Sequence, residues 1–359
     1  MSDEIYEKLA NVLDTLPNGF SRTEDGLEIR LLKKIFTPEE AELFCDLRMN
    51  FENPEQVAER TGRPLDGLDE KLKSMWDRGQ IFGVDFGTVR VYKMLPWVFG
   101  IYEFQVKRMD REFAEMAEEY NDRFAKDFFS GRPQLMQVLP VEVDIPAEHE
   151  ALSYEKVSSI IENGQSFAVG ECVCKKEQHL MDKGCDKPVE ICMGIAPVPG
   201  VFDNSWWGRA VTREEMYELL NKAEEEALVH LTWNMQHGHF FICNCCGCCC
   251  GVLRSINRHG VMGAVHSNYY AEIDPDACTA CGVCAEERCQ VEAITEQGEV
   301  YWVNPDRCIG CGLCISTCPA DAIALVRKPG DEQVVPPMDE KAWFDERAEN
   351  RGVDYSQYK

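Results

Sequence analysis

The cysteines of this chain could do the most chemistry, because a thiolate is both a nucleophile and a ligand for soft metals. Of nineteen cysteines in 359 residues, eighteen lie between residues 172 and 318, and Cys45 alone lies outside that range. The sequence starts without the basic and then apolar layout of a secretory signal, so we expect a cytoplasmic protein whose thiols stay reduced. Clustered cysteines in such a protein predict metal centres rather than disulfides.

An internal repeat in residues 272–326 has the spacing of iron–sulfur ligands. The segments IDPDACTACGVC and VNPDRCIGCGLC align at an offset of 30 residues. The second half continues to Pro319 as C-x2-C-x2-C-x3-C-P, the pattern of bacterial ferredoxins with two 4Fe-4S clusters, in which each half supplies the fourth ligand of the other cluster. We therefore predict two clusters, one held by Cys278, Cys281, Cys284 and Cys318 and the other by Cys308, Cys311, Cys314 and Cys289.

The first half of the repeat departs from this pattern at two places. Four residues separate Cys284 from Cys289, where the second half has three, and Gln290 stands where the second half has Pro319. We expect the extra residue to loop out while Cys289 remains a ligand. The departure favours unequal reduction potentials for the two clusters, because hydrogen bonds and solvent exposure tune each one.

Two further groups of cysteines precede the repeat. The first group has four thiols within 21 residues, enough for one metal centre: Cys172, Cys174, Cys185 and Cys192. Zinc sites favour C-x2-4-C pairs, and the C-x-C pair here is less usual for zinc. An iron–sulfur cluster is therefore favoured at this site, with a zinc ion or free buried thiols as the alternatives.

The second group is the stretch FICNCCGCCCG, residues 241–251, which has six cysteines in eight positions. Neighbouring side chains diverge on a regular backbone, so six such thiols cannot all converge on one cubane. Some of them supply ligands to the preceding group, hold a cluster of their own or bind an unusual cluster, and the rest line the site.

The elements that must position these thiols indicate an α+β protein with several units. Residues 1–95 read as short helices and a hairpin, which resemble a winged helix, and residues 96–150 read as a long helix and a linker. Residues 151–271 form a cysteine-rich α+β unit, with a capping box at Thr212 and Glu215. Residues 272–327 form the ferredoxin unit, and residues 328–359 a polar tail without chemistry.

Charge and hydropathy exclude several classes of partner. The formal net charge is −26, and residues 1–95 hold 13 Lys and Arg against 19 Asp and Glu, a net of −6. Nucleic acid and anionic membranes reward positive charge, so we expect neither as a partner. No run of eighteen apolar residues predicts a membrane span. The acidity instead favours a redox partner protein with a basic docking patch.

Together these pieces resemble a broad family of cytoplasmic iron–sulfur proteins of anaerobes, whose members join a winged-helix-like N-terminus, an ICNCC-x2-CC middle and a C-terminal two-cluster ferredoxin. Here that motif is residues 242–250. The resemblance implies that Cys248 is dispensable and assigns five ligands in the run, namely Cys243, Cys245, Cys246, Cys249 and Cys250.

The same resemblance implies electron transfer or redox chemistry without naming a substrate. We therefore expect an electron carrier with two 4Fe-4S clusters and at least one further iron–sulfur centre in the middle unit. A redox enzyme is the main alternative, with the middle centre as its active site and the ferredoxin unit as its electron supply. A small-molecule pocket beside that centre would favour the enzyme. An iron–sulfur sensor acting through the N-terminal part is a third class, which the acidity of that part disfavours.

Overall fold

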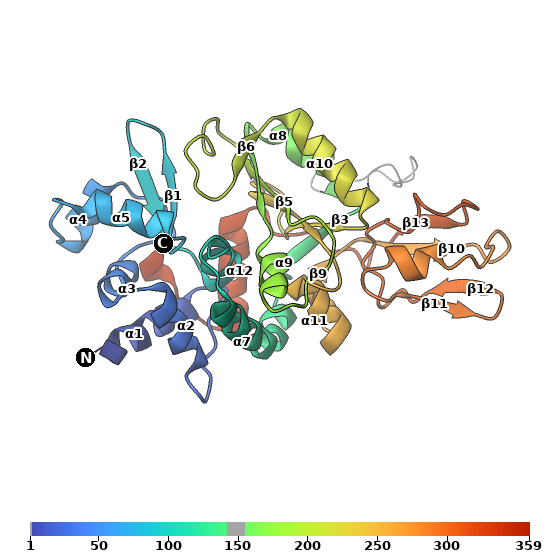
Figure 1. Cartoon of the computed structure of the whole chain (residues 1–359), viewed down its shortest axis with the longest axis horizontal. Coiled ribbons are helices and arrows are strands. Elements are labelled where there is room, and N and C mark those ends of the chain that lie inside the picture. Colours follow the sequence, from blue (N-terminus) through green and yellow to red (C-terminus); the bar gives the residue numbers. More distant parts are fainter. Residues whose placement is uncertain (1, 142–154) are drawn as a thin grey trace.

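A seven-stranded sheet occupies the middle of the molecule (Figure 1). The computed structural model describes residues 2–141 and 155–359. Neighbouring strands of the sheet are antiparallel except for the last pair, which is parallel. In spatial order the strands are β6 (Arg209–Val211), β4 (Ser166–Glu171), β5 (Glu190–Ala196), β8 (Phe241–Cys245), β7 (Val229–Trp233), β3 (Met136–Leu139) and β9 (Val265–His266).

Helices cover both faces of this sheet, because the alternating side chains of its strands are apolar on both sides. On one face, Ile242 and Met193 pack with α8 (Val157–Asn163) and α10 (Arg213–Glu225). On the other face, the covering helices are α7 (Arg111–Ser130), α9 (Val173–Leu180) and α11 (Gly251–His259). The predicted capping box is confirmed, since Thr212 accepts from the backbone of Glu215 and begins α10.

The N-terminal part contains the helices and the hairpin that the sequence predicts. Thr37 and Asn53 accept hydrogen bonds from the third residue of their helices, each of which has proline at its first position. Whether these elements form a true winged helix stays a prediction. The elements are α1 (Ser2–Thr15), α2 (Leu27–Ile35), α3 (Pro38–Cys45), α4 (Pro54–Thr61), α5 (Leu68–Asp77), β1 (Phe82–Asp85) and β2 (Arg90–Lys93).

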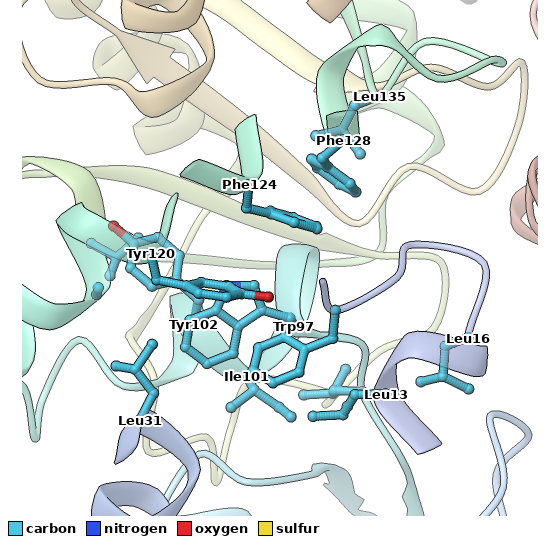
Figure 2. Close-up of a cluster of buried hydrophobic side chains, with 14 of the residues drawn as sticks. Leu13, Leu16, Leu31, Trp97, Ile101, Tyr102, Tyr120, Phe124, Phe128 and Leu135 are labelled. Atoms are coloured by element: carbon cyan, nitrogen blue, oxygen red, sulfur yellow. The ribbon is translucent and has the colours of Figure 1, made fainter. Parts of the chain in front are cut away.

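An aromatic cluster joins the N-terminal helices to α7 (Figure 2). The ring of Trp97, which is fully buried, lies 5.7 Å from that of Tyr120 and 5.9 Å from that of Tyr102. Leucines of α1 and α2 close the cluster from below in this view. Because buried aromatic pairs add to the burial of apolar area, this cluster fixes α7 against the N-terminal part.

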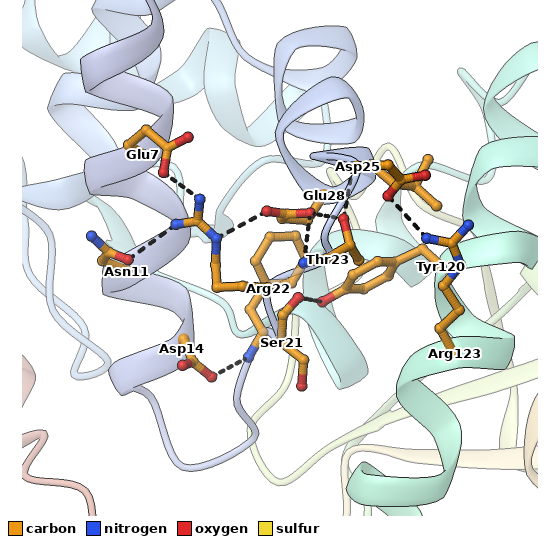
Figure 3. Close-up of polar contacts among 12 residues, drawn as sticks. Glu7, Asn11, Asp14, Ser21, Arg22, Thr23, Asp25, Glu28, Tyr120 and Arg123 are labelled. Atoms are coloured by element: carbon orange, nitrogen blue, oxygen red, sulfur yellow. Dashed lines mark hydrogen bonds and ion pairs between the residues drawn. The ribbon is translucent and has the colours of Figure 1, made fainter.

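Polar contacts beside this cluster hold the same elements together (Figure 3). The Tyr120 hydroxyl donates to the backbone oxygen of Ser21 at 3.1 Å. Arg123 of α7 donates to Asp25 at 2.9 Å, and Arg22 donates to the buried Glu28 at 2.9 Å. Most of these partners are half-exposed, so the contacts orient the helices more than they stabilise them.

Residues 96–150, which the sequence predicts to contain a long helix and a linker, contain the long helix α7 and a shorter helical piece before it. The short α6 (Tyr102–Phe104) ends in a turn, and α7 starts after Asp110, whose side chain accepts from the backbone of Phe113 at 2.8 Å. Aspartate prefers this capping position, so it starts a new helix here. Phe113 and Tyr120 are buried on one face of α7, as the helical spacing of apolar residues predicts.

The tail is also more structured than the sequence indicates. Residues 340–351 form α12 (Glu340–Arg351), which lies in the middle of the molecule, well away from the ferredoxin strands (Figure 1). Trp343 is fully buried, and its ring lies 5.2 Å from that of Trp233 on β7. The sequence reading missed this helix because its charged residues mask two buried aromatic positions.

Strand β3 was not expected either, since residues 96–150 read as a helix and a linker. The linker itself falls mostly in residues 142–154, which lie outside the described part of the chain. No helix in the described part is both long enough and apolar enough to cross a membrane.

Candidate metal centres

The ferredoxin unit consists of two similar halves with two short sheets. Strand β10 (Tyr269–Ile273) pairs with β13 (Ile323–Arg327), and β11 (Ile294–Gln297) pairs with β12 (Val300–Val303). Each half starts its ligand loop with the same turn. Asp274 accepts from the backbone of Cys278 at 3.0 Å through its carbonyl oxygen, and Asn304 accepts from that of Cys308 at 2.9 Å. The repeat in the sequence is therefore a repeat in the backbone.

The first predicted set of ligands lies around one small cavity in this unit. Three of its cysteines come from the first loop, and Cys318 comes from the end of the second half. Together the four are Cys278, Cys281, Cys284 and Cys318. Cys281 is exposed, so this end of the unit faces solvent.

The second set lies toward the body of the protein. Burial is the main cause that raises the pKa of the thiols of Cys308, Cys311 and Cys314, and the nearby Cys289 thiol raises all three further. Cys289 therefore lies beside the second loop, although it belongs to the first half of the sequence repeat. Cys289, Cys308 and Cys311 also pack against the main apolar core.

Backbone N–H groups point at several of these sulfurs. Ala293 donates to Cys289 at 3.2 Å, and Ala322 donates to Cys318 at 3.3 Å, each from four residues further along. Ala271 donates to the sulfur of Cys308 at 3.4 Å. Such bonds stabilise thiolate ligands and raise the potential of a cluster, so these donors fit iron–sulfur ligation in this unit.

The extra residue of the first half is absorbed by a wide helical turn. Residues Cys284–Arg288 form a π-type turn, in which the backbone of Cys289 donates to the oxygen of Cys284 at 3.0 Å. A π-type turn holds one residue more than an α-turn, so Cys289 keeps its place. The residue therefore widens the turn rather than looping out.

Gln290, which stands where the second half of the repeat has Pro319, connects the ferredoxin unit to the middle unit. Its side-chain oxygen accepts from the backbone of Gly247 at 2.9 Å. The approach is close, because a Cβ at position 247 would lie 2.2 Å from the backbone oxygen of Gln290. Gly247 stands between Cys246 and Cys248, so this contact ties one cluster loop to the cysteine run.

Four thiols of the middle unit lie together in a compact group, with all four sulfurs within 4.8 Å of one another. They are Cys185, Cys246, Cys248 and Cys249, which we call the four-thiol group. Cys185 comes from the loop between α9 and β5, and the other three come from the turn between β8 and α11. The Sγ of Cys185 lies 3.9 Å from that of Cys246 and 3.7 Å from that of Cys249.

These distances fit a single tetrahedral ion. Metal–sulfur bonds of about 2.3 Å place tetrahedral ligand sulfurs about 3.8 Å apart. A cubane, which carries one thiolate on each of four irons, needs a wider spread of sulfurs. Among the described residues, no other set of possible metal ligands is this compact. The four-thiol group therefore suits zinc or one iron ion.

The structure groups the cysteines of the middle unit differently from the sequence-based prediction. Cys185 does not lie with the three cysteines with which it was grouped, and Cys248, expected to be dispensable, belongs to the four-thiol group. The reason is that the turn after β8 brings three thiols of the run to the loop that carries Cys185.

The remaining six thiols line a buried cavity of about 130 Å³. We call them the six-thiol group, and in order of contact they are Cys172, Cys174, Cys250, Cys245, Cys243 and Cys192. Cys243 and Cys245 lie on β8, and Cys192 lies on β5. The Cys192 thiol and burial raise the pKa of the Cys243 thiol, so these groups need the charge of a bound metal to lose their protons.

Two helices begin at the six-thiol group. Cys172 precedes the first turn of α9, and Cys250 precedes that of α11. The N-terminus of a helix carries partial positive charge and free N–H groups, which favour thiolates. Six soft ligands beside two helix N-termini fit an iron–sulfur centre, and six exceeds the four thiolates that one cubane takes.

Lys175 lies buried between the two thiol groups. Its ammonium donates to the backbone oxygen of Asn244 at 3.0 Å, and 1% of the residue is exposed. Although burial alone would lower it, the thiols of Cys172 and Cys246 help hold the pKa of Lys175 above its usual value. This cation therefore offsets part of the negative charge of both groups.

Replacing Lys175 by methionine is expected to make the reduction potential of a centre in the six-thiol group more negative. Loss of one unit charge through an effective dielectric of about 20 corresponds to a shift on the order of 50 to 100 mV. A redox titration followed by electron paramagnetic resonance measures it. Lys176→Met is the matched control, because Lys176 is part-exposed and pairs with Glu171. Equal shifts in both variants would contradict a special role for Lys175.

Two carboxyl groups beside the six-thiol cavity were not predicted from the sequence. The Tyr102 hydroxyl donates to Glu177 at 2.7 Å, and burial raises the pKa of Glu177 to about 8. Glu118 lines the same cavity and pairs with Arg254 at 2.8 Å. In the sequence these carboxylates look like ordinary polar positions of helices. Lys175 could have been found, because it directly follows the C-x-C pair.

Comparison with known proteins supports the ferredoxin unit. Residues 301–324 match the family model of the 4Fe-4S binding domain, Fer4. This range contains the second ligand loop, from Cys308 to Cys318. No curated protein matches the chain. The match and the cysteine-rich middle unit indicate an iron–sulfur protein suited to electron transfer.

Proposed function

We propose that the protein carries electrons between a partner redox protein and a centre in its own middle unit. The observation that carries this proposal is the continuous series of thiol groups, which runs from an exposed ferredoxin loop to a buried cavity. Two 4Fe-4S clusters in the ferredoxin unit accept and pass single electrons. The six-thiol group holds a further iron–sulfur centre.

The order of the centres follows from exposure and contact. The cluster at Cys281 is the entry point, because that ligand is exposed. The cluster at Cys289 comes next, since this side of the unit packs on the body and Gln290 contacts the cysteine run. A single ion bound by the four-thiol group stabilises the cysteine run of residues 241–251. The six-thiol group receives the electrons.

The surface near the entry point favours a basic partner. Residues 272–300 contain eight Asp and Glu and one Arg, a formal net charge of −7. That arginine, Arg288, is buried and donates to the backbone oxygens of Leu313 and Glu224 at 2.8 Å. The exposed charge around this cluster is therefore negative, which steers a positively charged partner toward it.

Mediators of opposite character test this entry point. We expect the anaerobic protein to accept electrons from reduced methyl viologen, a cation, at a rate that falls at least severalfold between low salt and about 0.5 M salt, because salt screens the attraction. Stopped-flow absorbance measures the rate. The control is sulfopropyl viologen, whose two sulfonates give the reduced donor a net negative charge, so its rate should rise with salt instead. A flat salt profile for both mediators would contradict an acidic entry point, and an absence of reducible iron would contradict the proposed function itself.

A redox enzyme is the second candidate function, and one observation favours it. A large apolar cavity adjoins the six-thiol group, and two of that group's cysteines, Cys192 and Cys243, line it. A carrier needs no such cavity beside its buried centre.

A further inference from the structure

The apolar cavity lies between the N-terminal part and the middle unit. Its volume is about 510 Å³, which is within the range of small-molecule sites. Its walls come from the β1–β2 hairpin, the segment between β5 and β6, the sheet and α12. Thirteen of its lining residues are Phe or Trp, and four of the seven tryptophans of the chain are among them.

The mouth of this cavity leaves apolar surface in water. Ten large hydrophobic residues of the described chain are exposed, and four of them line this one cavity. These four are Phe51 at 44%, Phe86 at 47%, Val198 at 44% and Phe240 at 36% of their full exposure. Exposed apolar surface gathered in one place marks a binding site, because removing it from water is favourable.

A few polar groups are set into the apolar walls. The indole N–H groups of Trp206 and Trp233 have no acceptor within the described residues, and Trp233 is buried. Neither nitrogen is exposed to the cavity, so a ligand oxygen reaches one of them only when its indole ring turns. A buried donor without an acceptor is costly, which favours such a turn when a ligand offers an oxygen. The charged pair in the lining, Lys93 and Glu340, is already matched at 3.1 Å. The site therefore calls for a neutral ligand that accepts hydrogen bonds.

One end of the cavity reaches the six-thiol group. Cys192 and Cys243 line both cavities, and so does the half-buried Glu103. The backbone of Gly100 donates to the Glu103 carboxyl at 2.6 Å, and burial raises the pKa of that carboxyl to about 8.

We propose that the apolar cavity binds a neutral, ring-bearing small molecule with a carbonyl oxygen and holds it against the six-thiol group. The rings occupy the aromatic walls, and the oxygen accepts from an indole N–H such as that of Trp233. This inference rests on the proposed function in one respect, namely that the six-thiol group holds a redox centre. Binding itself does not depend on that centre.

The test uses 2-acetonaphthone, a fused-ring ketone, with anaerobic protein whose iron content has been measured. Equilibrium dialysis should show one saturable site per chain. Val198→Trp fills the mouth and should weaken binding at least tenfold. Val335→Trp is the matched control, because Val335 is 67% exposed and lies outside the cavity lining, and it should leave affinity unchanged.

A second comparison tests the orientation. Trp233→Phe keeps an aromatic ring but removes the N–H donor, so ketone affinity should fall about 2- to 12-fold, the factor for one hydrogen bond of about 0.5–1.5 kcal/mol. Naphthalene, which has the rings without the oxygen, should bind the variant as it binds the parent protein. Equal losses for both ligands would overturn the role of the N–H group.

A separate measurement tests whether the bound ketone lies beside the six-thiol group. Saturating ketone should alter the paramagnetic resonance spectrum of a centre in that group and leave the ferredoxin spectra unchanged. Iron-loaded protein that shows no saturable binding, or binding that is indifferent to Val198→Trp, would overturn the inference and leave the proposed function intact. Protein that binds the ketone but holds no iron would contradict the proposed function and leave the binding of the ketone intact.

Discussion

Replacement of Cys318 by alanine should remove the cluster held by the first ligand loop and spare the cluster of its own sequence neighbours. Cys318 lines the cavity of Cys278, Cys281 and Cys284. A cubane that loses one of its four thiolates is exposed to solvent and falls apart, so about four irons per chain should be lost. Iron analysis and paramagnetic resonance measure the loss.

Alkylation shows which cluster has gone. In the Cys318→Ala protein, an iodoacetamide label should appear on Cys278, Cys281 and Cys284, as identified by peptide mass spectrometry. Cys289→Ala is the matched variant, because Cys289 is the crossing ligand of the other cluster in our assignment. It should expose Cys308 and Cys311 instead. Labelling of Cys308 in the Cys318 variant would contradict the crossed arrangement.

Replacement of Cys248 by alanine should empty the four-thiol group of its metal. The group is compact enough for one tetrahedral ion, and three thiolates bind such an ion much more weakly than four. We expect the loss of one zinc or one iron per chain, with the ferredoxin clusters unchanged. Elemental analysis by mass spectrometry measures both metals in the same sample.

The control for this loss is Cys45→Ala, since Cys45 is the one cysteine remote from every thiol group in the sequence and packs among the N-terminal helices. It should retain all of its metal. Metal content in the Cys248 variant equal to that of the parent would exclude the four-thiol group as a site. It would also restore the sequence-based expectation that Cys248 is dispensable.

Features that depend on near neighbours were predictable from the sequence. The helix starts at Thr37, Asn53 and Thr212 follow from side chains that cap the backbone three residues ahead. The ferredoxin loops follow from ligand spacing in the same way. The insertion before Cys289 could be seen, but its accommodation in a π-type turn could not, because an extra residue can be absorbed in several ways.

The grouping of the middle thiols could not be predicted from the sequence, because it depends on which strands are neighbours in the sheet. Strand β8 lies between β5 and β7, so Cys243 meets Cys192 across a strand pair that spacing alone does not reveal. The place of Cys185 depends on the loop before β5 in the same way. Strand β3 and helix α12 were missed for a related reason, since each is stabilised by elements far away in the chain.

The pairing of β10 with β13 determines where the ferredoxin unit stands in the order of synthesis. Tyr269 on β10 is paired with Arg327 on β13, so the chain enters and leaves the unit at adjacent points. The unit is therefore an insertion within the body, whose last core helix, α12, is synthesised after it. Trp343 of that helix packs beside Trp233, so this part of the core can be completed only after the ferredoxin unit has been synthesised. The middle cysteines, from Cys172 to Cys250, are therefore all synthesised before the helix that completes this part of the core.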